Sequence, residues 1–96
     1  MRPSEALASQ RDHLLALAAA GGASRVRVFG SVARGVDREG SDLDLLVDMA
    51  EGTSLLDIVG LQLALEDALG VRVDLCTTPE LHPALRRNIL AEARSV

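Results

Sequence analysis

The chain has very few aromatic residues, no lysine and a single cysteine. Phe29 is the one aromatic residue among 96, so the flat side chains on which single-stranded nucleic acids stack are almost absent. All ten basic residues are arginines, which excludes a Schiff-base lysine and a phosphate-binding P-loop lysine. Cys76 has no second cysteine to pair with, and no Cys/His cluster has zinc-ligand spacing. The candidate chemical groups are therefore mainly carboxylates, arginines, hydroxyls and the backbone.

Positive charge is also in short supply. The formal net charge is −4, which is the wrong sign for neutralising a long phosphate backbone, and we expect no direct nucleic-acid partner. The first residues lack the pattern of an export signal, and the apolar run 16–20 is too short to span a membrane. We therefore expect a cytoplasmic protein with no membrane partner.

The remaining composition predicts one folded domain. Apolar residues make up 48% of the chain and charged residues 25%, which excludes intrinsic disorder. A length of 96 residues is well below that at which chains divide, and neither a repeat nor a linker interrupts it. We expect residues 1–96 to form a single domain.

Hydrophobic periodicity predicts alternating helices and strands. The predicted helices cover about 3–20, 31–36 and 53–69, with a last one that begins at Thr78-Pro79 or just before Pro83. The predicted strands cover 25–29, 42–48 and 71–76. This order predicts an α/β domain whose small mixed sheet, of three to four strands, is flanked by helices. For the helix over 53–69, the predicted buried stripe is Leu55, Ile58, Val59, Gln62, Leu65 and Leu69.

Three aspartates are candidates for metal binding. Asp42 and Asp44 are two residues apart on a predicted strand, so both carboxylates project from the same face. Asp74 lies on the outward face of the third predicted strand, and it would complete a three-carboxylate cluster if the second and third strands were neighbours. A cluster of oxygen ligands favours Mg²⁺ or Mn²⁺ over zinc, and it suits two-metal phosphoryl or nucleotidyl transfer.

A candidate phosphate-binding turn precedes these aspartates. Gly30 and Ser31 lie between a predicted strand and a short predicted helix. Glycine allows close approach of the backbone, and a helix N-terminus presents free N–H groups. Arg34, one helical turn later, would reach a phosphate as well. Together with the aspartates, this turn provides what a magnesium nucleoside triphosphate requires.

Each of these features also has a purely structural interpretation. Gly30-Ser31 would serve as a simple strand-to-helix turn with a serine cap. Asp42 and Asp44 would form the solvated face of an edge strand, where charge prevents unwanted pairing. Arg34 would be a solvated helix residue, and Arg72 would be either a salt-bridge partner or a phosphate contact. The combination at this spacing favours the functional interpretation.

The order of these residues resembles the signature of the nucleotidyltransferase superfamily. That signature is a Gly-Ser pair followed by Asp-x-Asp, here Gly30-Ser31 and Asp42-Leu43-Asp44 with ten residues between Ser31 and Asp42. The small size, the run from Phe29 to Gly35 and the later Val73-Asp74-Leu75 look like the minimal nucleotidyltransferases. These proteins are the antitoxin partners of HEPN-domain toxins.

The resemblance implies a polymerase-β-like palm that binds ATP with two Mg²⁺ ions and transfers AMP to a protein hydroxyl. In that family the acceptor is a tyrosine of the HEPN ribonuclease partner. Carried over, Gly30 and Ser31 would hold the β- and γ-phosphates, with Arg34 as a further contact. Asp42 and Asp44 would ligate both metals, and Asp74 would hold the catalytic metal and help to deprotonate the hydroxyl.

A second hypothesis assigns the protein no catalytic role. The domain would neutralise a toxin by covering its active site, and its acidic face would complement a basic partner surface. A template-directed or tailing polymerase fits poorly, because no basic tract is left to hold a primer.

Overall fold

The computed structural model describes residues 1–96 with the exception of the Glu80 side chain. The helices are α1 (Pro3–Ser9), α2 (Arg11–Ala20), α3 (Gly30–Arg34), α4 (Leu55–Leu69) and α5 (Pro83–Glu92), with the 3-10 helix η1 (Thr78–Glu80) before α5. The strands are β1 (Ala23–Phe29), β2 (Leu43–Met49), β3 (Val73–Thr77) and β4 (Arg94–Ser95).

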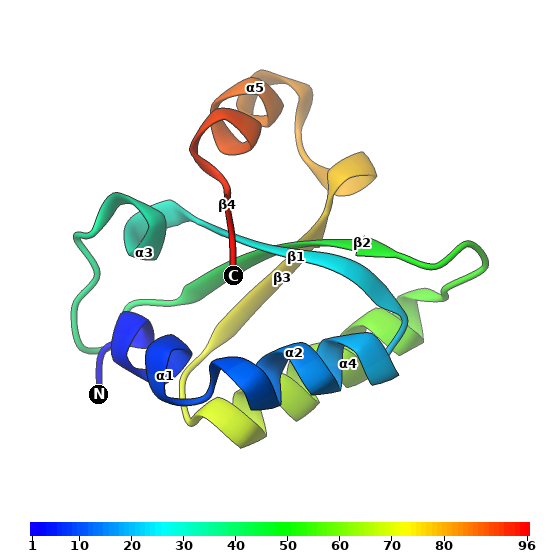
Figure 1. The fold of residues 1–96 in the computed structure, drawn as a ribbon. Coiled ribbons are helices and arrows are strands. Elements are labelled where there is room, and N and C mark those ends of the chain that lie inside the picture. Colours follow the sequence, from blue (N-terminus) through cyan, green and yellow to red (C-terminus); the bar gives the residue numbers. More distant parts are fainter.

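The four strands form one mixed sheet in the order β3-β2-β1-β4. β1 runs antiparallel to both β2 and β4, whereas β2 and β3 run parallel. Helices cover both faces: α1, α2 and α4 lie on one side of the sheet, and α5 with η1 lies on the other (Figure 1). The predicted fold class, a small mixed α/β sheet flanked by helices, is confirmed.

The main core lies between the sheet and helices α2 and α4. The inward alternation predicted for β2 is confirmed, because Leu43, Leu45 and Val47 are all buried there. They pack with Val73 and Leu75 of β3 and with the buried leucines of α4. Burial of these side chains on one face leaves Asp42, Asp44 and Asp74 on the other face of the sheet.

A second, smaller core lies on the opposite face. Phe29, Leu46 and Leu81 form it, and Ile89 and Ala93 at the end of α5 pack against it. Leu46 is fully buried although it shares its face of β2 with the aspartates. Arg27 of β1 lies opposite Leu46 on this face and is 13% exposed, whereas Asp44 and Asp74 lie near the starts of β2 and β3.

The first helix differs from the prediction of one helix over about 3–20. The chain breaks at Gln10, whose φ of −119° and ψ of 20° are not helical, and two helices result. No glycine or proline marks this break, so the apolar periodicity continued through it. Within α2, Leu14 and Ala18 are the buried residues.

The boundaries of α4 match the prediction, whereas its buried face does not. Ser54 caps the helix by accepting a hydrogen bond from the Asp57 N–H at 3.1 Å, and Gly70 ends it in the left-handed conformation. Leu61, Leu65 and Leu69 are buried, but Leu55 and Val59 are exposed, which contradicts the predicted stripe. Leucines occur all around this helix, so periodicity alone did not fix the phase.

The C-terminal segment begins its helix at Pro83, the second of the two starts considered. It then adds β4, a strand of two residues that was too short to be read from alternation. Within the described part of the chain, no helix has the length and apolar character needed to cross a bilayer.

Candidate functional site

The predicted phosphate-binding turn lies where β1 ends and α3 begins. Gly30 has a φ of +70°, a left-handed conformation that favours glycine. A Cβ atom built on Gly30 would overlap the carboxylate of Asp44. Glycine is therefore required twice at this position, once for the backbone conformation and once for the space that Asp44 occupies.

Asp44 lies at the centre of the candidate site. It faces Phe29 at the end of β1 and Asp74 on β3 in the strand register. The expectation that the second and third predicted strands are neighbours is thus met, and the sheet brings Gly30, Asp44 and Asp74 together. These residues come from three separate segments of the chain.

The surroundings of Asp44 disfavour its negative charge. Partial burial, the most important cause, and the charges of Asp74 and Asp42 raise the pKa of Asp44 to about 6, and Glu92 adds to this effect. Arg34 acts in the opposite direction and lowers the Asp44 pKa. Such concentration of negative charge around one half-buried carboxylate is typical of a cation site.

Asp42 is paired with an arginine. Its Oδ1 accepts from the Nε of Arg72 at 2.9 Å, and the Arg72 Nη2 lies 2.9 Å from the same oxygen. Of the two interpretations of Arg72, the salt-bridge partner is therefore the one observed. The arginine is well exposed, so this ion pair is screened by water and is easily opened.

The aspartates supply the oxygen ligands that a magnesium site needs, but their side chains are not arranged around one point. Their oxygen atoms suit Mg²⁺, and Asp44 and Asp74 are in-register neighbours. However, with the Glu80 side chain set aside, no three His, Cys, Asp or Glu side chains are grouped so as to hold a metal ion. The expected cluster of three is thus not closed while Asp42 is held by Arg72.

Glu92, at the end of α5, is a site residue that was not predicted. Its Oε1 accepts from the Gly30 N–H at 2.8 Å, and both of its oxygens contact the Nη1 of Arg34, at 3.3 and 3.2 Å. It lies 62 residues from Gly30 in sequence, so spacing gave no signal.

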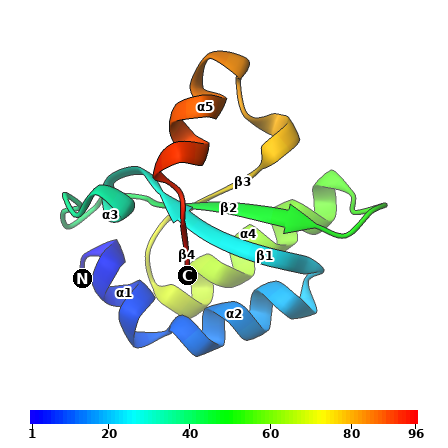
Figure 2. The same ribbon diagram turned by 45° about the horizontal axis from the view of Figure 1, so that its top comes forward.

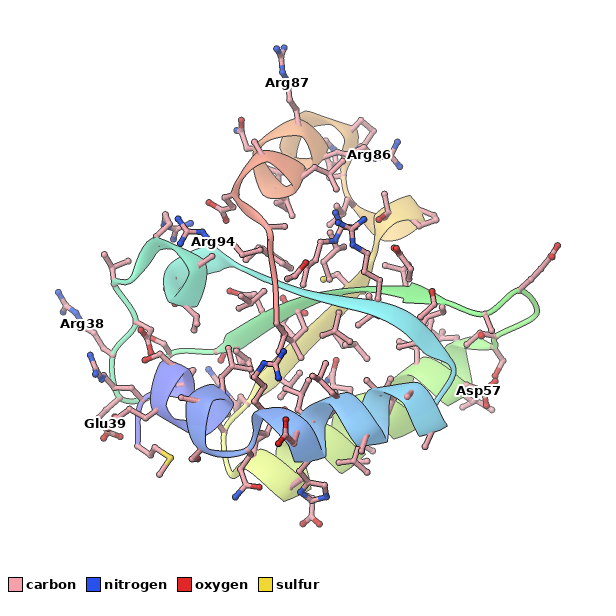
Figure 3. All side chains as sticks on the ribbon, viewed as in Figure 1. Arg38, Glu39, Asp57, Arg86, Arg87 and Arg94 are labelled. Carbon is pink, nitrogen blue, oxygen red and sulfur yellow. The ribbon has the colours of Figure 1, made fainter. Side chains whose placement is uncertain are left out.

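Three arginines outside this site come from two separate parts of the chain. Arg38 follows α3, whereas Arg86 and Arg87 lie on α5, and Figure 3 shows Arg38 and Arg87 pointing into solvent from different parts of the molecule.

Residues 11–96 match the family model of the nucleotidyltransferase domain. The chain belongs to this family. The site just described, with its Gly-Ser turn and its two facing aspartates, is thus the candidate active site of a nucleotidyltransferase.

Relatives and solved structures agree with this assignment. MJ0435 of Methanocaldococcus jannaschii, which carries the name protein adenylyltransferase, is 48% identical over 78% of this chain and 81% of its own length. The protein adenylyltransferase MntA of Thermococcus cleftensis is 42% identical over 74% of this chain and 72% of its own. A structure assigned as a minimal nucleotidyltransferase is 55% identical, with a TM-score of 0.86, and covers 97% of this chain and 95% of that one.

A more distant structure shares the fold. It is a toxin–antitoxin crystal structure with AMP-PNP, 21% identical with a TM-score of 0.76, and the match covers 88% of this chain and 69% of that one. At this identity the likeness concerns the arrangement of helices and strands alone.

Proposed function

We propose that this nucleotidyltransferase transfers AMP from ATP to a hydroxyl group of a partner protein. The observation that carries the proposal is the convergence of Gly30, Asp44 and Asp74, because it joins a phosphate-binding turn to paired carboxylates. Relatives that carry the name protein adenylyltransferase support a protein as the acceptor.

Gly30, Ser31 and Arg34 are the proposed phosphate-binding residues. The left-handed backbone at Gly30 starts α3 directly after β1, so the first turn of α3 faces the aspartates. The Ser31 hydroxyl and the guanidinium of Arg34 add donors suited to the β- and γ-phosphates of ATP. We prefer this assignment to a purely structural capped turn, because a capped turn does not require paired carboxylates beside it.

Asp42, Asp44 and Asp74 are the proposed ligands of Mg²⁺, with two ions as the family resemblance implies. Magnesium, when bound, would supply a positive charge that neutralises the triphosphate. For Asp42 to take part, its carboxylate must leave Arg72, which is an exposed and therefore weak ion pair.

The proposed reaction is an in-line displacement at the α-phosphorus. The acceptor oxygen forms a bond to the α-phosphorus, the bond from that phosphorus to the bridging oxygen breaks, and pyrophosphate leaves. The proton of the acceptor hydroxyl passes to the carboxylate of Asp74. Atoms and charge are thus balanced without any redox partner.

The proposed acceptor is a tyrosine of a HEPN ribonuclease toxin, and the protein would act as its antitoxin. This step follows the family resemblance, and it agrees with the shared fold of the toxin–antitoxin structure.

The test uses purified protein, ATP labelled at the α-phosphate, Mg²⁺ and the product of the adjacent gene. We expect label on the partner, and we expect its loss with EDTA and with Asp42→Asn, while circular dichroism shows that the variant is folded. Full activity of both Asp42→Asn and Asp44→Asn would contradict the proposal.

A second candidate function is silencing of the toxin by binding alone. The pairing of Asp42 with Arg72 favours it, since the carboxylates that the structure describes are not grouped for a metal in this state. In that case the aspartate variants would still protect cells, and the toxin purified after co-expression would carry no added AMP mass.

A further inference from the structure

Glu92 connects the C-terminal helix to the phosphate-binding turn. Its carboxylate oxygen Oε1 bridges the backbone N–H of Gly30 and the Nη1 of Arg34, which are the two ends of the short helix α3. α5 thus reaches across the open face of the sheet to α3, and the two views in Figures 1 and 2 show α5 on that face.

The bridge occupies the Gly30 N–H and leaves the other phosphate-binding groups available. Glu92 engages only the Nη1 of Arg34, whereas a guanidinium carries five N–H donors. Within the described residues, the Nε and Nη2 of Arg34 and the hydroxyl of Ser31 make no hydrogen bond to other side chains or backbone. A phosphate can therefore bind Arg34 and Ser31 while Glu92 remains in place.

The bridge also restricts the arginine. The Arg34 side chain is 55% exposed and the Glu92 side chain 28%. The ion pair therefore holds an exposed arginine against a carboxylate that is more deeply buried. Arginine loses side-chain entropy when it is fixed for a ligand, and a preformed ion pair removes part of that cost before the ligand binds.

We propose that Glu92 is a positioning residue for nucleotide binding. It orients Arg34 toward the phosphates, without contacting the nucleotide itself. This inference rests on the proposed function, since it assumes that a triphosphate binds at this turn through Ser31 and Arg34.

If Glu92 instead competed with the phosphates, its removal would change nucleotide affinity in the opposite direction. A carboxylate that occupied the phosphate position would compete with ATP, and its removal would tighten nucleotide binding. A carboxylate that positions Arg34 gives weaker binding when it is removed. The sign of the change in affinity therefore decides between the two roles.

The experiment is a double-mutant cycle on the whole chain, read by calorimetric titration with AMP-PNP and Mg²⁺. We expect Glu92→Gln to raise Kd about tenfold, because the ion pair with Arg34 is lost and only a hydrogen bond to an uncharged amide remains. In an Arg34→Gln background the same change should have almost no effect, because Glu92 acts through Arg34.

Glu5→Gln is the matched control. Glu5 also accepts from one backbone N–H and one arginine, from the Arg2 N–H at 2.9 Å and the Arg2 Nε at 3.3 Å, but it does so at the start of α1. Its removal should leave Kd unchanged. If Glu92→Gln does not fold, Glu92→Asp takes its place in the cycle, because it keeps the charge but shortens the reach to Arg34.

The possible outcomes separate the two proposals. Unchanged or tighter binding by the Glu92 variant, or equal effects with and without Arg34, would overturn the role of Glu92 alone. Failure of the unmodified protein to bind AMP-PNP would overturn the proposed function and the role of Glu92 with it.

Discussion

A glycine and an aspartate share one space at the candidate site. Gly30 leaves room for the Asp44 carboxylate, and its left-handed backbone turns the chain from β1 into α3. Gly35 ends α3 with nearly the same φ, +73°, but a Cβ atom there would have no neighbour within 4 Å. A substitution at Gly35 therefore adds backbone strain alone, whereas a substitution at Gly30 adds the same strain and also a clash with Asp44.

Gly30→Ala should lose far more activity than stability. Both Gly30→Ala and Gly35→Ala should cost about 1–2 kcal/mol of unfolding free energy, because alanine is strained at positive φ. Only the first displaces Asp44, and we expect AMP transfer to fall by about a hundredfold, as a small misplacement of catalytic groups does. Thermal unfolding and the labelled-ATP assay check both. Equal activity of the two variants would contradict the close approach of Gly30 and Asp44.

Asp44→Asn should stabilise the protein while it removes activity. Burial and the neighbouring Asp74 and Asp42 raise the Asp44 pKa to about 6 from 3.8, so the fold favours the protonated carboxyl. The cost of its charge is absent below about pH 4, grows as the pH rises, and is complete above about pH 6. After a discount for solvent screening, we expect a gain of about 1–2 kcal/mol at pH 7.

Thermal unfolding in EDTA at pH 7 and pH 4 checks this prediction. The Asn variant should melt several degrees higher at pH 7 and at nearly the same temperature as the parent at pH 4. Asp57→Asn is a useful control, because hydrogen bonds from the Ser54 backbone and hydroxyl hold the Asp57 pKa below its usual value. That change should destabilise the protein at pH 7, which is the opposite sign.

Candidate residues that belong to a local motif could be predicted from the sequence. Candidate residues that only the fold brings to the site could not. Gly30, Ser31, Asp42 and Asp44 form a local pattern, and Asp74 followed from strand alternation. Glu92 reaches Gly30 only because α5 lies over the open sheet face. The ion pair of Asp42 likewise depends on the loop before β3, which no local pattern describes.

At the scale of single elements, strands were easier to predict than the buried face of a helix. Period-two alternation in β2 and β3 has two possible phases, and the charged residues select one of them. In α4, leucines lie on every side, and the groove between α2 and the sheet decides which are covered.

Leu65→Ala and Leu63→Ala test the observed phase of α4. Leu65 is fully buried, and its truncation should cost about 2–5 kcal/mol of unfolding free energy. Leu63 is 59% exposed, and the same change there should cost less than about 0.5 kcal/mol. Urea unfolding of both variants measures the difference. Similar losses would place the buried face of α4 elsewhere.

At the scale of the whole molecule, the C-terminal segment completes both the sheet and the site. β4 pairs with β1 along the edge of the sheet, with Arg27 opposite Ser95 and Val28 opposite Arg94. Glu92 lies only two residues before Arg94, so the pairing of β4 sets where this carboxylate can reach. We therefore expect that loss of the β4 pairing would also disturb the phosphate-binding turn that Glu92 contacts.

Proline substitutions in β4 test this coupling. The Val96 N–H donates to the Val26 carbonyl at 3.2 Å, and antiparallel alternation makes Arg94 and Val28 the next hydrogen-bonded pair. Arg94→Pro removes that donor, so it should lower the unfolding free energy by about 1–3 kcal/mol and weaken AMP-PNP binding.

Ser95→Pro is the matched control, because the Ser95 N–H points away from β1 in the same alternation. The residue before Arg94 has the backbone conformation that precedes proline, since Ala93 has a φ of −63° and a ψ of 134°. We therefore expect Ser95→Pro to keep both stability and nucleotide affinity. Loss of stability in Arg94→Pro with unchanged AMP-PNP affinity would show that the site does not depend on the sheet edge. Loss of both would mean that β4 and α5 act as one unit that carries Glu92 to the phosphate-binding turn.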